Sequence, residues 1–334
     1  METLTIRLGS RSYDGVMPIV NREVGIPGVD IQVKLDNNVP RLFASLFKGE
    51  LDAGEMSLAE LIYYTSRGKA DFIGVPVFPS RVFRHGCLFC LRDSGIRGPG
   101  DLAGRKIGFQ RWVQTAGVWM RGMLVEDYGL LPARDWYVAS MHHWDDAPED
   151  EVAPRDGSSI RRYGIPADAQ TEVSAQALLS GEVDVIGVTE NVAPSLLAND
   201  RVRRLFEDAA AEEAAYYRRT GIFPIMHVLA IKTNLVENRP ELPEELFRLF
   251  CDAKQRAHST VHAVPTWGLA WKDEYVGRER QLFGRDPWQF GLSANRHVLD
   301  KFVDYCWRQG IAARRLDAQE LFAPSTWELV DAAG

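Results

Sequence analysis

The 334-residue chain has few cysteines and few lysines, no excess of positive charge and no long apolar run. It has four cysteines, and 46 Asp+Glu against 39 Lys+Arg give a formal net charge of −7. A disulfide-stapled scaffold is excluded, and the basic excess typical of nucleic-acid-binding proteins is missing. No apolar stretch approaches the roughly 18 residues that a membrane helix needs. We therefore expect neither a nucleic-acid partner nor a membrane segment.

What the chain does contain is typical of a globular protein with a large core. Apolar residues make up 46% and charged residues 25%, and the length exceeds what one hydrophobic core usually supports. Only eight of the 39 cationic residues are lysine, so arginine supplies most of the positive charge. The planar fork of arginine suits carboxylates better than lysine does. These features predict two lobes, and they allow an acidic ligand despite the net negative charge.

The start of the chain and its cysteines favour the cytoplasm. Met1 leads at once into the strand-like segment Thr3–Leu8, without the basic and apolar regions of a secretory signal. Cys87 and Cys90 form a C-x-x-C pattern, but no second pair follows at zinc-site spacing. Strand positions three apart also face opposite sides of a sheet. We expect reduced core thiols, no metal site and no organic cofactor.

A short pattern occurs twice, 132 residues apart. Residues 46–52 and 178–184 both read L-x-x-G-E-(apolar)-D and are followed by a strand-like run. Glycine in this place is typical of a helix end before a strand. The pattern predicts two α/β lobes of similar construction, and the element order implies that the second lobe is inserted into the first. We place lobe I at 1–94 and 226–334, and lobe II at 95–225.

Several longer segments resemble the 4,5-dihydroxyphthalate decarboxylase family. They are Val75–His85, Asp101–Gly108, Ala116–Leu124, Tyr216–His227 and Gly291–Arg296. The resemblance implies a two-lobed, type II periplasmic-binding-protein-like fold, with a mixed sheet and flanking helices in each lobe and a ligand cleft between the lobes. It also implies cofactor-independent decarboxylation of a hydroxylated aromatic acid, most simply 4,5-dihydroxyphthalate to protocatechuate and carbon dioxide.

Two other functions stay open at this point, because one fold supports many functions. One is a non-catalytic solute-binding protein for a small aromatic or anionic ligand, and the other is a different small-molecule enzyme on the same scaffold. For the decarboxylase we expect a small anionic aromatic substrate as the partner. The sequence is also compatible with a homo-oligomer.

The first candidate site residues follow a predicted buried strand. They lie within residues 75–85, one of the segments that resemble the decarboxylase family. Arg81 and Arg84 are candidates for binding a substrate carboxylate, because arginine forms bidentate bonds with carboxylates. His85 is a candidate catalytic acid, since histidine titrates near neutral pH. His227, in an otherwise apolar strand at an expected crossover, is the second catalytic candidate. The alternative for Arg81, Arg84 and His85 is a polar loop with one salt bridge, and the alternative for His227 is a buried structural role.

Further candidates come from expected helix starts and strand ends. Ser57 is predicted to cap a helix, with Glu60 completing a capping box. Thr115 occupies the equivalent place in the second lobe, so the two could form a two-sided anion site. Of the neighbours His142 and His143, at most one faces the cleft.

The last candidates carry weaker signals. Arg296 opens a helix and is a candidate for substrate binding or for a surface role. Glu190 follows a predicted strand where we expect the family to carry a basic residue, so an acid there would disfavour a second substrate carboxylate. His258 and His262 are one helical turn apart, but no H-E-x-x-H motif accompanies them, and we expect no metal.

Overall fold

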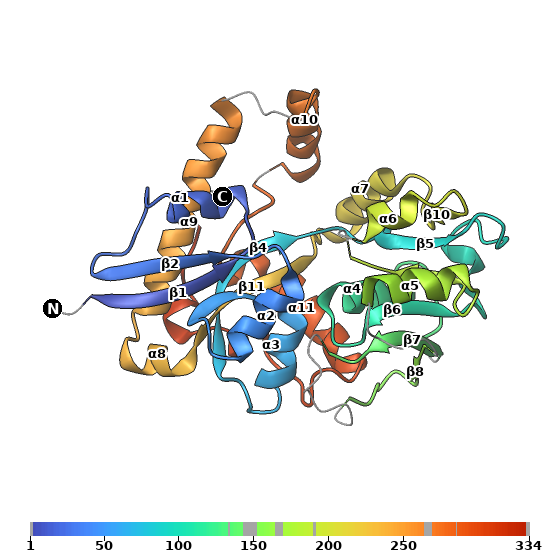
Figure 1. Ribbon diagram of the computed structural model, residues 1–334, viewed down its shortest axis with the longest axis horizontal. Helices are drawn as coiled ribbons and strands as arrows, with labels where there is room; N and C mark the ends of the chain where they lie inside the picture. The colour runs from blue at the N-terminus through green and yellow to red at the C-terminus, as the bar shows by residue number, and fades with distance from the viewer. Residues whose placement is uncertain are drawn as a thin grey trace.

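The structure is a computed structural model that describes residues 3–132, 134–142, 152–163, 170–189, 192–263, 269–284 and 286–331. Two α/β lobes lie side by side along the longest axis of the molecule (Figure 1). Each lobe is built on its own sheet, so the two-lobed α/β architecture predicted from the sequence is confirmed.

The sheet of the first lobe has the strand order β2-β1-β3-β11-β4. Its strands are β1 (Leu4–Ser10), β2 (Val29–Leu35), β3 (Ala53–Ser57), β4 (Phe72–Arg81) and β11 (Ile225–Lys232). Strands β1, β2 and β3 are parallel, whereas β11 runs antiparallel to both β3 and β4. The carboxyl ends of β1, β3 and β4 therefore meet the start of β11 at one edge of the sheet.

Helices cover both faces of this first sheet. They are α1 (Met17–Val20), α2 (Val39–Phe47), α3 (Leu58–Thr65), α8 (Thr233–Asn238) and α9 (Leu242–Ala263). The long helix α9 packs its apolar face, including Leu246 and Phe250, against Ile6 and Leu8 of β1. Helices α2 and α3 pack in the other core, which contains Met56 of β3. Helix α10 (Lys272–Phe283) stands beyond α9 at the top of Figure 1 and has no buried residue.

The sheet of the second lobe has the strand order β10-β5-β9-β6-β7-β8. Its strands are β5 (Leu88–Leu91), β6 (Ile107–Arg111), β7 (Asp135–Ser140), β8 (Ser159–Arg162), β9 (Val185–Gly187) and β10 (Val202–Arg204). Its helices are α4 (Thr115–Glu126), α5 (Gln170–Leu179), α6 (Ala193–Leu197) and α7 (Ala209–Thr220). Because β6 to β9 are parallel, their carboxyl ends form one edge, as in the first lobe.

The chain crosses between the lobes at two neighbouring segments. It leaves the first sheet after Arg81 and enters the second at Leu88, and it returns between Gly221 and Ile225. The Val82 amide donates a 3.1 Å hydrogen bond to the Pro224 carbonyl, which holds the two crossovers together. The first boundary thus lies before β5, earlier than the expected position between 94 and 95. Local pattern identifies β5 as a strand but does not show which sheet it joins.

The C-terminal helix α11 (Leu292–Arg308) connects both lobes. Its Phe302 stacks on Trp119 of α4 with ring centroids 4.9 Å apart. The residue after it, Gln309, accepts a 2.7 Å hydrogen bond from the buried Arg121 guanidinium and donates to the Val118 carbonyl. Although the sequence places α11 in the first lobe, it thus packs against the second lobe as well. These contacts tie α11 to the second lobe.

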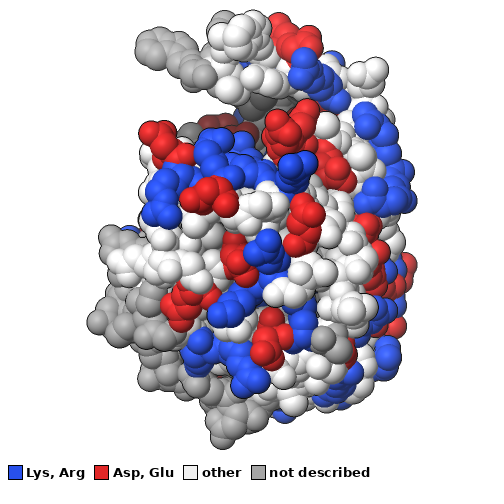
Figure 2. Space-filling model, turned by 90° about the vertical axis from the view of Figure 1, so that its right-hand side faces the viewer, with Lys and Arg blue, Asp and Glu red and all other residues white. Residues whose placement is uncertain are grey.

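The outer face of the second lobe shows no accumulation of positive charge. In Figure 2, Lys and Arg side chains lie interspersed with Asp and Glu over this face. None of the helices in the described ranges is long and apolar enough to cross a membrane.

Candidate active site

The candidate site lies where the carboxyl ends of the parallel strands of the two lobes meet, the usual place for ligands in α/β sheets. Ser57 ends β3 in the first lobe, and Thr115 begins α4 in the second. Their hydroxyl oxygens are 2.9 Å apart, and the Ala59 amide donates a 3.0 Å hydrogen bond to the Thr115 hydroxyl. Both side chains are buried. The structure thus brings together the two residues that the sequence placed at equivalent helix starts.

Ser57 does not make the capping box that the sequence predicts. It occupies the N-cap position of α3, but its side chain makes no capping hydrogen bond. Its hydroxyl contacts Thr115 instead, and Glu60 lies 3.4 Å from His142, measured from Oε2 to Nδ1. The hydrogen bond between Ser57 and Thr115 across the lobes thus takes the place of the predicted capping box. Ser57 and Glu60 therefore line the interface between the lobes.

A buried carboxylate organises the first-lobe side of the site. Glu55 of β3 accepts four hydrogen bonds: from the Ser10 hydroxyl at 2.9 Å, the Arg11 amide at 2.6 Å, the Tyr13 hydroxyl at 3.1 Å and Nδ1 of His227 at 2.9 Å. The side chain of Glu55 is 2% exposed and that of His227 is 13% exposed. The carboxylate is therefore shielded from water, while the imidazole reaches the surface of the interface.

The surroundings of Glu55 determine its charge. Burial alone would raise the pKa of this carboxyl, but the hydrogen bonds from His227, the Arg11 amide and Ser10, together with the charge of His227, hold the pKa below its usual range. Glu55 is therefore ionised at neutral pH and accepts the Nδ1–H of His227. This arrangement leaves Nε2, which has no hydrogen-bond partner among the described residues, for proton exchange with a ligand.

A second His–Glu pair crosses between the lobes. His142 follows β7, and its ring lies edge-on to Tyr63 of α3, with centroids 4.7 Å apart. The His142 and Glu60 side chains are 2% and 0% exposed. This pair is more deeply enclosed than the pair of His227 and Glu55, so it is better suited to hold the lobes together than to exchange protons with a ligand.

Amides and hydroxyls complete the rim of the site. Oε1 of Gln110, near the end of β6, accepts from the side chain of Gln114 at 3.4 Å and from the Thr189 amide at 3.3 Å. On the opposite lobe, burial is the largest factor raising the pKa of Tyr13, followed by the charge of Glu55, so Tyr13 keeps its proton. Ser80 pairs across the strands with His227. The rim thus offers hydrogen-bond donors from both lobes.

Sequence reasoning missed Glu55, Tyr13 and Gln110. Glu55 carries the one usable signal: it is the only charged residue of the short strand Ala53–Ser57, all of whose residues are buried. A charge in such a strand needs partners. Those partners come from the loop after β1, and a sequence does not reveal that proximity.

Arg81 ends β4, where it pairs with Ile225 of β11, and a register shift separates this pair from that of Ser80 and His227. The Arg81 guanidinium donates to the Gln289 carbonyl at 2.9 Å and to the Asn295 side chain at 2.5 Å. These bonds tie β4 to the start of α11. Arg81 therefore has a structural task that its sequence position did not indicate.

His85 and Arg84 lie in the first crossover and are buried outside this site. The His85 ring lies among the rings of Tyr128, Phe206 and Tyr216, with centroid separations of 5.9, 5.1 and 5.2 Å. Neither ring nitrogen has a hydrogen-bond partner among the described residues, and burial lowers the pKa of His85 to about 4. A neutral ring inside this aromatic cluster is an unfavourable place for a catalytic acid, so the catalytic role of His85 stays a prediction from the sequence. Nε of Arg84 lies 3.2 Å from the Met226 sulfur.

The remaining candidates lie elsewhere. Arg296 is on the surface, where its guanidinium bonds to Asp300 at 2.9 Å and to Asp317 at 2.8 Å, so it has the surface role that the sequence left open. Glu190 and His143 lie outside the described residues, as does the side chain of His262. Within the described ranges, no three His, Cys, Asp or Glu side chains cluster as metal ligands.

Comparison with known proteins identifies the family. Over 332 residues the chain is 31% identical to a 4,5-dihydroxyphthalate decarboxylase of Comamonas testosteroni, covering 98% of this chain and 99% of that protein. The chain belongs to the 4,5-dihydroxyphthalate decarboxylase family. A second 4,5-dihydroxyphthalate decarboxylase, from Pseudomonas putida, is 32% identical over 227 residues, covering 65% of this chain and 83% of that protein. No family model matches the chain.

Solved structures show the fold of this decarboxylase family member. The periplasmic aliphatic sulphonate-binding protein SsuA of Escherichia coli matches with a TM-score of 0.54 and 13% identity, covering 97% of this chain and 98% of that one. The alkanesulfonate-binding protein SsuA of Xanthomonas axonopodis pv. citri matches with a TM-score of 0.54 and 16% identity, covering 98% and 99%. The periplasmic-binding-protein-like fold implied by the sequence resemblance is confirmed.

Proposed function

We propose that this protein removes one carboxylate from 4,5-dihydroxyphthalate, giving protocatechuate and carbon dioxide. Family membership supports the reaction class, because both curated relatives carry that name. The observation that carries the mechanism is the 2.9 Å hydrogen bond between Nδ1 of His227 and the buried Glu55 carboxylate. It provides an oriented proton donor at the interface of the two lobes.

The reaction needs a proton at the ring carbon that loses its carboxylate. Each carboxylate of 4,5-dihydroxyphthalate lies para to a hydroxyl group, whose oxygen supplies electron density to that carbon. The protonated His227 ring, stabilised by Glu55, delivers its Nε2 proton to the carbon. The carbon–carboxylate bond then breaks, its electron pair restores the aromatic ring, and carbon dioxide leaves. His227 regains a proton from water.

The helix starts of the two lobes would hold the remaining carboxylate. The Ser57 and Thr115 hydroxyls and the Ala59 amide now bond to one another. All three are hydrogen-bond donors beside the amino-terminal ends of α3 and α4, where the helix dipoles favour an anion. A bound carboxylate would replace the direct contact between Ser57 and Thr115. Substrate-binding roles of Arg81, Arg84, His142 and Glu190 stay predictions from the sequence.

The decisive experiment measures product rather than binding. The purified protein is incubated with 4,5-dihydroxyphthalate, and protocatechuate and carbon dioxide are quantified. We expect both products from the wild type and from Arg296→Ala, and a loss of at least about a hundredfold in rate for His227→Gln. A saturable thermal shift without product would instead support the solute-binding alternative. Turnover of another acid alone would support a different enzyme on this scaffold.

The proposal also covers the class of ligand and the cellular compartment of the protein. The ligand is a small anionic aromatic molecule, and the compartment is the cytoplasm. All four cysteines are free thiols, the state that a reducing compartment maintains. Cell fractionation with an antibody against the native protein tests the location. The homo-oligomer stays a prediction, which light scattering of the purified protein checks.

A further inference from the structure

A second pocket lies in the second lobe, at the sheet edge opposite the candidate active site. It has a volume of about 490 Å³, within the usual range for small-molecule sites. Arg105 and Lys106, which precede β6, and Asp135, which begins β7, line it. Since the active-site groups follow the other ends of these parallel strands, the pocket is a separate place in the molecule.

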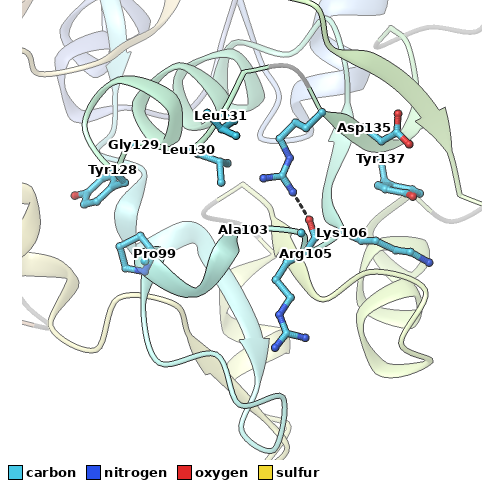
Figure 3. A pocket seen from close by; sticks show the side chains of 13 residues that line it. Pro99, Ala103, Arg105, Lys106, Tyr128, Gly129, Leu130, Leu131, Asp135 and Tyr137 are labelled. Atoms are coloured by element: carbon cyan, nitrogen blue, oxygen red, sulfur yellow. Dashed lines mark hydrogen bonds between the residues drawn. The ribbon is translucent and has the colours of Figure 1, made fainter.

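One wall of this pocket is apolar. Pro99 and Ala103 lie across from Leu130 and Leu131 in Figure 3. Leu130 is buried, but Leu131 is 77% exposed, which makes it the most exposed of the large apolar side chains in the described ranges. Tyr137 adds an aromatic ring on the other side of the pocket. The pocket can therefore enclose a flat, apolar body.

The same pocket has positive charge without matching negative charge. The half-buried Arg134 donates to the carbonyls of Leu102 and Arg105, and its Nε has no partner among the described residues. It forms no ion pair with a described carboxylate. Lys106 likewise has no ion pair in the described part of the chain, and its ammonium lies 5.9 Å from the centre of the Tyr137 ring.

The other charges of the lining are already paired. Arg105 pairs with Asp184 at 3.4 Å, and Asp135 pairs with Arg161 at 3.3 Å. The charge of Asp135 acts on Arg134 but does not form an ion pair with it, so Arg134 and Lys106 remain as two cations without an ion-pair partner in the described ranges, beside apolar walls. A half-buried guanidinium of this kind is stabilised further when an anion binds it.

We propose that this pocket binds a small aromatic carboxylate. The carboxylate would lie between Lys106 and Arg134, and the ring would pack against Leu130, Leu131 and Tyr137. The proposal rests on the walls and charges of the pocket and does not depend on the reaction proposed for the other site.

The test uses 4-fluorobenzoate and the full-length protein, with binding followed by the fluorine NMR signal. We expect a saturable component that both variants weaken by about tenfold: Lys106→Gln because it loses one charge-assisted contact, and Leu131→Asp because it replaces an apolar wall by a negative charge that repels the carboxylate. Both side chains are exposed, so both variants should fold. Leu197→Asp and Lys48→Gln change an exposed leucine and an exposed lysine elsewhere, and both should bind like the wild type.

A further variant distinguishes binding in this pocket from binding in the active site. The pocket component should persist in Thr115→Val, and 4-fluorobenzyl alcohol, which lacks the carboxylate, should bind at least about tenfold more weakly. Equal affinity of the wild type, Leu131→Asp and Lys106→Gln would overturn the proposal, and so would loss of all binding in Thr115→Val. Absence of decarboxylation would leave these binding results unchanged.

Discussion

Replacing Glu55 by glutamine tests the central pair of the proposed mechanism with the smallest change in shape. Glutamine keeps one acceptor oxygen, which can serve the Ser10 hydroxyl and the Arg11 amide. In the variant, the side-chain NH₂ group of glutamine faces the Tyr13 hydroxyl and Nδ1 of His227. Both of these groups donate hydrogen bonds to the carboxylate in the wild type. The tyrosine hydroxyl can rotate, but the imidazole has to change tautomer. We expect a loss of about 1–3 kcal/mol in the free energy of unfolding, the cost of one unsatisfied buried group.

The effect on turnover should exceed the effect on stability. Without the carboxylate of Glu55, Nδ1 of His227 is no longer held as the donor and the ring is less firmly oriented. We expect kcat to fall about 10²–10³-fold for Glu55→Gln, within the range for loss of general acid catalysis. Substrate affinity should change much less than kcat.

The dependence of stability on pH has a defined sign. The pKa of Glu55 is lower in the folded protein than in the unfolded chain, so the carboxylate stabilises the fold above its unfolded pKa of about 4.3. That stabilisation is lost as the pH falls through the folded pKa. The difference between wild type and Glu55→Gln should therefore be largest near neutral pH and shrink in acid, as measured by denaturant unfolding.

A matched control is available in the second lobe. Glu213 is a partly buried carboxylate whose oxygen accepts a 3.0 Å hydrogen bond from the Gly86 amide, outside the candidate active site. Glu213→Gln should keep kcat within about twofold of the wild type, since its side chain does not contact the reacting groups. A Glu55→Gln variant as active as the wild type would refute the role assigned to the carboxylate.

Three further predictions follow from the placement of the other candidates. His85→Phe should retain kcat, and inactivity at pH 7 would support the catalytic role of His85. The free energy of unfolding of this variant should also fall less than that of the wild type between pH 7 and 5. The reason is that the pKa of His85 is lowered to about 4 in the folded protein, so the unfolded chain binds that proton more tightly. Thr115→Val should raise KM about tenfold while Thr115→Ser does not, since the hydroxyl is the donor in question; equal KM values would exclude it. Arg296→Ala should change the unfolding free energy by less than about 1 kcal/mol, as for exposed ion pairs, and leave kcat/KM unchanged.

The repeated L-x-x-G-E-(apolar)-D pattern was a sound guide to the fold, and the structure shows why. Gly49 and Gly181 both adopt left-handed backbone conformations, with φ of 74° and 78°. The aspartate that ends each copy accepts a backbone hydrogen bond from the neighbouring parallel strand: Asp52 from the Arg7 amide at 3.0 Å and Asp184 from the Lys106 amide at 2.8 Å. The helix end is local information, which the glycine reveals, whereas the strand contact of the aspartate joins residues distant in the sequence.

The site was only partly predictable, because its contacts join distant parts of the chain. Ser57 and Thr115 were found by their positions at helix starts, which local sequence reveals. The pairing of His227 with Glu55 spans 172 residues and depends on the antiparallel position of β11 beside β3. His85 shares its segment with family-like residues, yet its environment is set by rings from three other segments. No local pattern distinguishes such a buried histidine from a catalytic one.

The boundary between the lobes shows the same limit. Residues 88–91 were recognisable as a strand, but membership of the second sheet follows from pairing with β9 and β10, more than 90 residues later in the chain. Helix α11 likewise reaches the second lobe through Phe302, which an amphipathic pattern identifies only as a core residue. Tertiary contacts, rather than local propensity, decide both assignments.

The most direct test is to incubate the protein with 4,5-dihydroxyphthalate and to measure protocatechuate and carbon dioxide together, beside His227→Gln. We expect the two products in equal amounts from the wild type and almost none from the variant. Binding of the substrate without either product, or undiminished turnover by His227→Gln, would contradict this expectation.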